Sequence, residues 1–81
     1  MITPGQCRAA RALLSVSQKQ LADSAGISLR TLQGFEAGER DLQSLALSAI
    51  ERFLAEQGIR LINDSNWSGV KLSLHAKPAS S

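Results

Sequence analysis

The sequence predicts a mainly α fold, a small bundle of four helices followed by a C-terminal β-hairpin. Three observations support this prediction. Capping patterns and glycines divide the chain up to Gly58 into short helices. Apolar residues at helical spacing give each of these helices one apolar face. Beyond Gly58 the pattern changes to an alternation of apolar and polar residues, which is typical of strands.

The first helix is expected from Pro4 to about Leu14. Thr3 and Gln6 form a capping box around its start, in which side-chain oxygens accept free amides of the first turn. Proline is favoured at the first helical position because its missing amide costs nothing there. The apolar face of this helix is expected to carry Cys7, Ala10, Leu13 and Leu14.

Two short helices around a tight turn are expected over residues 18–25 and 29–37. Ser17 opens a second capping box, Gly26 ends the first helix with a left-handed backbone, and Ser28 caps the second helix. A small residue, a glycine four positions later and apolar residues beyond the turn form the helix-turn-helix pattern. The inward positions are expected to be Leu21, Ala22, Ala25, Ile27, Leu32 and Phe35.

A fourth helix is expected from about Leu42 to Gln57, after Gly38 has ended the third helix and residues 39–41 have formed a polar connection. Gly58 is expected to provide its left-handed cap. The apolar face of this helix consists of Leu47, Ile50, Phe53 and Leu54.

The last alternating segments predict two strands over residues 59–63 and 70–74, joined by a loop of about six residues. An isolated hairpin is marginal in water, so these strands need a further surface. The helical body, a second copy of the chain or a different protein could supply it. We expect packing on the helices together with strand-mediated pairing of two copies. The alternative is a C-terminal flap on a monomer.

Residues 17–38 closely resemble the Cro/repressor-type (XRE-like) helix-turn-helix domain of bacterial and phage regulators. The segments that carry this resemblance are Gln18-Lys19-x-Leu21-Ala22, Ala25-Gly26-Ile27-Ser28 and Leu32-x-x-Phe35-Glu36-x-Gly38. The resemblance covers roughly residues 3–57 and implies a lambda-repressor-like helix-turn-helix bundle. The expected organisation is therefore a DNA-binding domain over residues 1–58, a dimerising hairpin extension over 59–75 and a disordered tail over 76–81.

The resemblance implies sequence-specific binding of double-stranded DNA by a small transcriptional regulator, expected to be a repressor. The recognition helix over residues 29–37 would lie in the major groove. Arg30 can donate two hydrogen bonds to guanine, Gln33 can pair with adenine, and Leu29 can pack on a thymine methyl group. The positions nearest the base edges would be Leu29, Arg30, Gln33 and Gly34.

Phosphate contacts are expected to position the protein on the duplex. They are assigned to Gln18, Lys19, Ser28, Thr31 and Arg40. Gly34 departs from the family pattern, because many members carry a long polar side chain there. Either the backbone approaches the DNA closely at Gly34 or the position is unread. Arg11 and Glu36 occupy positions that form an ion pair in several family members, and the same pair is expected here.

The charge distribution agrees with a DNA-binding surface in the first half of the chain. The net charge is only +2, but five basic residues face three acidic ones up to Arg40, whereas four of each follow from Asp41 onward. An enzyme is not expected, since His75 is the only histidine and the sequence has neither a His/Cys cluster nor a glycine-rich phosphate loop. No metal and no cofactor are predicted.

The rival interpretation is an antitoxin-like or phage-type interaction protein whose hairpin binds a protein partner. Trp67, in the hairpin loop, could anchor such a partner or could fold back over the domain's own core. The single cysteine, Cys7, is expected to be a small buried hydrophobe in a reducing cytoplasm. Neither a signal peptide nor a membrane-spanning segment is expected.

Overall fold

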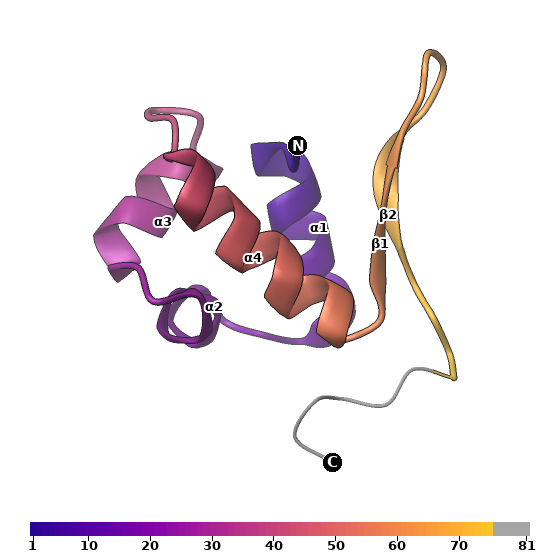
Figure 1. Ribbon diagram of the computed structural model, residues 1–81, viewed down its shortest axis with the longest axis horizontal. Coiled ribbons are helices and arrows are strands. Elements are labelled where there is room, and N and C mark those ends of the chain that lie inside the picture. The colour runs from indigo at the N-terminus through magenta and orange to yellow at the C-terminus, as the bar shows by residue number, and fades with distance from the viewer. Residues whose placement is uncertain (76–81) are drawn as a thin grey trace.

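The structure, a computed structural model of the 81-residue chain, describes residues 1–75. The mainly α fold with a C-terminal hairpin is confirmed (Figure 1). The tail expected over residues 76–81 lies outside the described residues. The elements are α1 (Pro4–Leu14), α2 (Gln18–Ala25), α3 (Leu29–Glu36), α4 (Ser44–Glu56), β1 (Ile59–Asn63) and β2 (Ser68–Leu72).

Both expected capping boxes are formed, and they explain why α1 and α2 begin where the sequence predicts. The Thr3 hydroxyl accepts a hydrogen bond from the main-chain amide of Gln6 at 3.1 Å, and the side-chain oxygen of Gln6 accepts one from the main-chain amide of Thr3 at 3.0 Å. Ser17 and Gln20 make the same reciprocal pair at 3.0 and 2.8 Å. Gly26 ends α2 with a φ of 71°, in the left-handed region that favours glycine.

The predicted start of α4 was wrong by two residues. α4 begins at Ser44 because Gln43 occupies the N-cap position in an extended conformation, without a side-chain capping bond. The half-buried Leu42 packs against the core outside the helix. On α1, the prediction for Leu13 was also wrong: its side chain is 47% exposed, whereas Cys7 and Ala10 are fully buried.

The predicted position of the second strand was also wrong. β2 spans Ser68–Leu72 rather than residues 70–74, so the connecting loop is residues 64–67. Asp64 closes this loop, because its carboxylate accepts the amides of both Asn66 and Trp67 at 2.8 Å. Asn63 then pairs with Ser68, which brings Ser68 into the strand.

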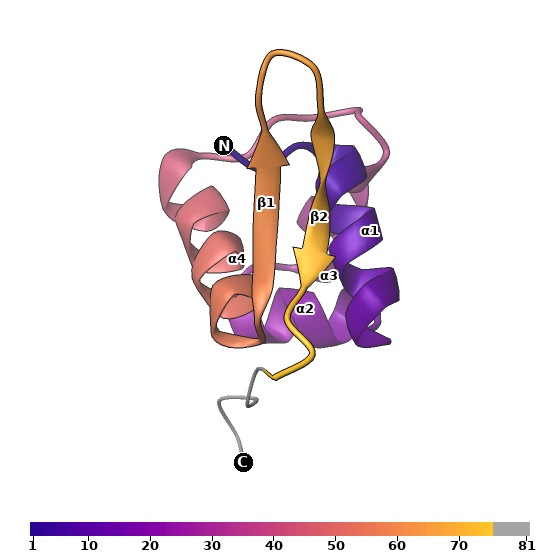
Figure 2. The same ribbon diagram turned by 90° about the vertical axis from the view of Figure 1, so that its right-hand side faces the viewer.

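The hairpin covers one face of the helical body, with β1 beside α4 and β2 beside α1 (Figure 2). Ile59 is 6% exposed and belongs to the core, and Leu61, Val70 and Leu72 pack half-buried against it. These are alternate residues of paired strands, so they share the inner face. The expected packing of the hairpin on the helices is confirmed. The buried apolar core consists of Ile2, Cys7, Ala10, Leu21, Ala22, Leu32, Phe35, Leu47, Ile50, Leu54 and Ile59.

Gln6 fastens the hairpin to the start of α1, a role that the sequence analysis did not foresee. Its side chain is 2% exposed. The side-chain amide donates to the carbonyls of Ile62 and Gly69 at 3.1 and 2.9 Å and approaches the Asn63 side-chain oxygen at 3.0 Å. One side chain thus caps α1 and contacts both strands of the hairpin.

Across residues 1–75, none of the helices combines the length and the apolar character that a membrane crossing requires.

Candidate nucleic-acid interface

The turn between α2 and α3 fixes the position of α3 against the body. The Ile27 amide donates to the Ala22 carbonyl at 3.0 Å, which folds the chain back directly after Gly26. Ala22 is 1% exposed, so the two helices approach each other over a small side chain. Leu32 and Phe35 bury the inner face of α3. The helix lies at the opposite end of the molecule from the hairpin (Figure 1), and its outer face is free of both strands.

Glu36, at the end of α3, joins three helices through its buried carboxylate. It is 2% exposed. Arg11 of α1 donates to both carboxylate oxygens, at 2.8 Å from Nε and 2.7 Å from Nη2, which confirms the expected ion pair. Gln18 of α2 donates at 3.0 Å, and the Cys7 thiol donates at 3.1 Å. A further arginine of α1, Arg8, donates to the Glu36 main-chain carbonyl.

These contacts govern the protonation of Glu36 and Cys7. Burial by itself would raise the pKa of Glu36, but the hydrogen bonds from Arg11, Cys7 and Gln18 outweigh it and hold this pKa below its usual value. Burial, together with the adjacent Glu36 carboxylate, raises the pKa of the Cys7 thiol above its usual range. The expectation of a buried, unreactive cysteine agrees with this environment.

Three of the nine residues expected to contact DNA lie together on the outer face of α3, and a fourth, Arg40, joins them from the segment that follows the helix. Arg30, Gln33, Gly34 and Arg40 line a shallow depression of about 310 Å³, with Glu39 at its margin. Leu29 is 37% exposed at the start of the same helix. The depression therefore brings together three of the four positions expected to lie nearest the bases and Arg40, which was expected to contact phosphate.

The remaining four expected contact residues lie around the starts of α2 and α3. Lys19 is exposed and makes a surface ion pair with Asp23 at 3.2 Å, a type of pair that contributes little to stability. Ser28 caps α3 and donates to the Thr31 hydroxyl at 2.7 Å. Gln18 uses one side-chain N–H for Glu36, which leaves its second N–H for another acceptor.

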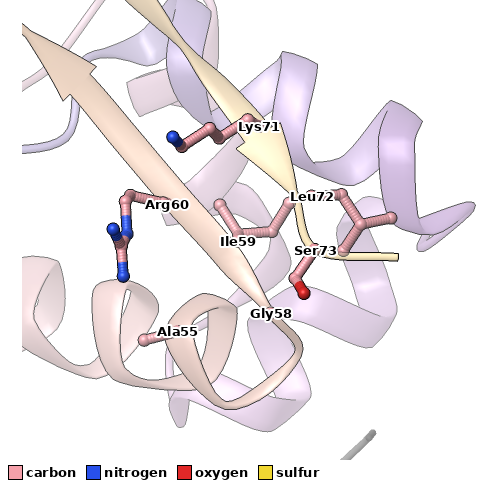
Figure 3. Close-up of a pocket in the computed structure, with 7 residues that line it drawn as sticks. All are labelled: Ala55, Gly58, Ile59, Arg60, Lys71, Leu72 and Ser73. Atoms are coloured by element: carbon pink, nitrogen blue, oxygen red, sulfur yellow. The ribbon is translucent and has the colours of Figure 1, made fainter. Parts of the chain in front are cut away.

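A second depression, of about 580 Å³, lies at the base of the hairpin on the side of the molecule remote from α3 (Figure 1). Figure 3 shows Arg60 and Lys71 projecting on its margin from neighbouring strands. These two cations are direct cross-strand partners. The sequence analysis assigned no role to this surface, whose lining consists of Ala55, Gly58, Ile59, Arg60, Lys71, Leu72 and Ser73.

Comparison with known proteins gives one match to a family and none to a characterised relative. A family model described as helix-turn-helix matches residues 8–58. This match begins within α1 and ends at Gly58, two residues after the end of α4 and directly before β1. The comparison with curated proteins found no match.

Proposed function

Since the chain belongs to the Cro/repressor-type (XRE-like) helix-turn-helix family of DNA-binding transcription regulators, we propose that it is a repressor that reads a specific double-stranded DNA sequence through α3. The observation that carries this proposal is the division of α3 into two faces. Leu32, Phe35 and Glu36 are buried and fix the helix, while Leu29, Arg30 and Gln33 are exposed. A rigidly held helix with free polar side chains is what major-groove recognition requires.

The proposed contacts divide into base readers and phosphate contacts. Arg30 donates to guanine and Gln33 to adenine, and Leu29 packs on a thymine methyl group. Gln18, Lys19, Ser28 and Thr31 hold the phosphates on either side, because their polar groups lie around the first turns of α2 and α3. Repression requires no further surface, since a protein bound over a promoter excludes the polymerase by occupying the DNA.

Selection from a random pool of double-stranded DNA tests the proposal directly. The full chain is expected to enrich one sequence family, and its operator, placed in a promoter, is expected to lower transcription of a reporter. Enrichment of no sequence would refute specific DNA reading. Enrichment with unchanged or increased transcription would refute the repressor role alone.

Arg30→Ala is expected to weaken binding to the selected operator by about 1–3 kcal/mol and to flatten the preference at one base pair, because a bidentate contact to guanine is lost. Lys19→Ala should instead weaken all sequences alike and reduce the dependence of binding on salt. Arg52→Ala, which removes an exposed charge on α4, is the matched control. Fluorescence anisotropy at several salt concentrations measures each effect. Operator binding by Arg30→Ala as tight as that of the wild type would contradict the assignment of this face.

We propose further that two copies bind a two-fold operator, with half-sites about 34 Å apart, one turn of DNA. The hairpin supports this proposal because both of its edges can accept another strand. Ser73 donates to the Gly58 carbonyl and Asp64 to the Trp67 carbonyl. In an antiparallel pair, facing residues alternate between pairs that exchange main-chain hydrogen bonds and pairs that do not. Counted from these two bonds, Leu61 and Val70 face each other without such bonds, so their N–H and C=O groups point away from the hairpin. The far end of the hairpin extends beyond the helices in both views (Figures 1 and 2).

Analytical ultracentrifugation of the full chain is expected to find a dimer at tens of micromolar. Amide hydrogen exchange should then slow with concentration at the outward-facing amides of one strand, Leu61 and Asn63 or Ser68 and Val70. Arg60 and Lys71, whose amides face the partner strand within the hairpin, serve as the internal reference. A protein that stays monomeric, or a dimer in which these outward-facing amides do not change, would overturn the strand-mediated arrangement.

A second candidate function is binding of a protein partner through the hairpin, as in an antitoxin-like regulator. The observation that favours it is Trp67, which is 72% exposed at the hairpin loop instead of covering the core. An exposed tryptophan at a loop tip is a typical anchor of an interface. A toxin-like reading frame next to this gene would support this candidate if the protein that it encodes also shields Trp67 from solvent in a complex with this chain. Operator binding that is indifferent to Trp67→Ala, with no such neighbour, would favour the repressor alone.

A further inference from the structure

Gly34 lies on the outer face of α3, one helical turn after Arg30 and directly after Gln33. The side chain of Arg40 occupies the space that a side chain at position 34 would need. A Cβ atom on Gly34 would lie 2.7 Å from Cδ and 3.0 Å from Cγ of Arg40. Both distances are shorter than ordinary carbon–carbon contacts, so even alanine at position 34 would displace the stem of Arg40.

The fold of the chain after α3 brings Arg40 to this place. Gly38 adopts a φ of 75°, which reverses the chain direction at the end of the helix. The Glu39 amide then donates back to the Gly34 carbonyl at 2.9 Å. This bond holds the turn against the third-last residue of α3, and the next residue along the chain is Arg40.

The guanidinium of Arg40 has no hydrogen bond and no ion pair with any residue in the described range 1–75. The side chain is exposed, and it lines the same depression as Arg30 and Gln33. Its stem lies beside Gly34 while its five N–H donors stay free. A stem that already lies along α3 in the free protein lowers the entropy lost when the guanidinium binds.

We propose that Arg40 is a base-reading residue, which lies across Gly34 and supplies from the turn the long polar side chain that α3 lacks at that position. This inference rests on the proposed function, in which α3 reads DNA. It replaces the expected phosphate contact of Arg40 with a contact to the edge of a guanine in the major groove. The planar guanidinium presents two parallel donors that match guanine O6 and N7.

The test compares variants of the full chain on the operator that the wild type selects. Arg40→Ala is expected to weaken operator binding about 10- to 100-fold and to flatten the preference at one base pair. Arg40→Lys should flatten the same base pair, because an ammonium keeps the charge but loses the bidentate pair. Repeating the selection with each variant measures both effects.

Gly34→Ala is the more specific variant, because it keeps Arg40 in the chain and removes only the space beside position 34 in which the Arg40 stem lies. Alanine is favoured over glycine inside a helix, so thermal stability should be maintained while the preference at the Arg40 base pair is lost. In the Arg40→Ala background, Gly34→Ala should cause no further loss of operator affinity. Gly5→Ala is the matched control, since a Cβ on Gly5 in α1 would meet neighbouring atoms at ordinary contact distances of 3.7 and 4.0 Å.

Two results would overturn the inference while the wild type still selects an operator. One is a uniform loss of affinity in Arg40→Ala with a weaker salt dependence, which would identify a phosphate contact. The other is an unchanged base preference in Gly34→Ala, which would show that the space at Gly34 does not determine the position of the Arg40 side chain. Failure of the proposed function itself is distinct, because the wild type would then select no sequence.

Discussion

Replacing Glu36 by alanine is expected to lower the free energy of unfolding by about 3–5 kcal/mol, the usual cost of removing one partner from a buried ion pair. The carboxylate accepts two hydrogen bonds from Arg11 and one each from Gln18 and Cys7. Arg11 is only 20% exposed, so its charge would be left poorly solvated. Because these bonds join α1 and α2 to the end of α3, DNA affinity should fall together with stability.

Glu36→Gln separates the charge from the shape of this side chain. It keeps the size of the side chain and one acceptor oxygen, but it loses the negative charge and turns an N–H2 group toward donors that the carboxylate accepted, so it should also lower the free energy of unfolding. Urea unfolding followed by circular dichroism measures both variants, with Glu56→Ala, at the exposed end of α4, as a control for a lost surface carboxylate. An unfolding midpoint for Glu36→Ala that equals that of the wild type would refute the role of this network.

Acid should remove the same stabilisation from the wild type. The pKa of Glu36 is lower in the folded protein than in the unfolded chain, where a glutamate has a pKa of about 4.3. The contribution of Glu36 is therefore complete above that value and is lost as the pH falls through the lower folded pKa. Between neutral pH and the acid range, Glu36→Gln should lose less stability than the wild type.

Gln6→Glu is the second large expected effect, a loss of about 2–3 kcal/mol in the free energy of unfolding, concentrated in the hairpin. A carboxylate keeps the oxygen that accepts the Thr3 amide, so the capping box survives. It also replaces the N–H2 group that donates to the carbonyls of Ile62 and Gly69 with a second oxygen. Buried oxygens would then face one another with no hydrogen between them to form a bond.

Amide hydrogen exchange locates this effect. Exchange should accelerate in β1 and β2 more than in α3. Thr3→Ala removes the opposite half of the capping box without touching the hairpin bonds and should destabilise α1 by about 1 kcal/mol. Equal acceleration throughout the chain in Gln6→Glu would contradict a local fastening of the hairpin.

The starts of the first three helices could be predicted because each is encoded by neighbouring residues. Thr3 and Ser17 begin capping boxes whose partners lie three residues later, and Ser28 caps α3 in a similar way. The start of α4 was wrong because Gln43 has no capping bond to encode it. The position of β2 was wrong because Asp64 closes its loop two residues earlier than the alternating pattern suggested.

The candidate site could be predicted only in part, for a related reason. Helical spacing was enough to place Arg30 and Gln33 on the outer face of α3. The contact of Arg40 with Gly34 depends on the direction of a left-handed turn at Gly38, which spacing within one helix does not describe. The hairpin contacts of Gln6 join residues 56 to 63 positions apart, and nothing in the local sequence distinguishes this glutamine from an ordinary capping residue.

The double role of Gln6 has a consequence for folding during synthesis. A ribosome makes the helical residues first, and the buried amide of Gln6 cannot meet its acceptors until β1 and β2 have left the exit tunnel. Ile59, which closes the core, is also made after all four helices. We therefore expect the nascent helices to be loosely packed and the native state to form only after β1 and β2 have left the tunnel. In such a chain, DNA-binding competence would be acquired after translation of the hairpin rather than after translation of α3.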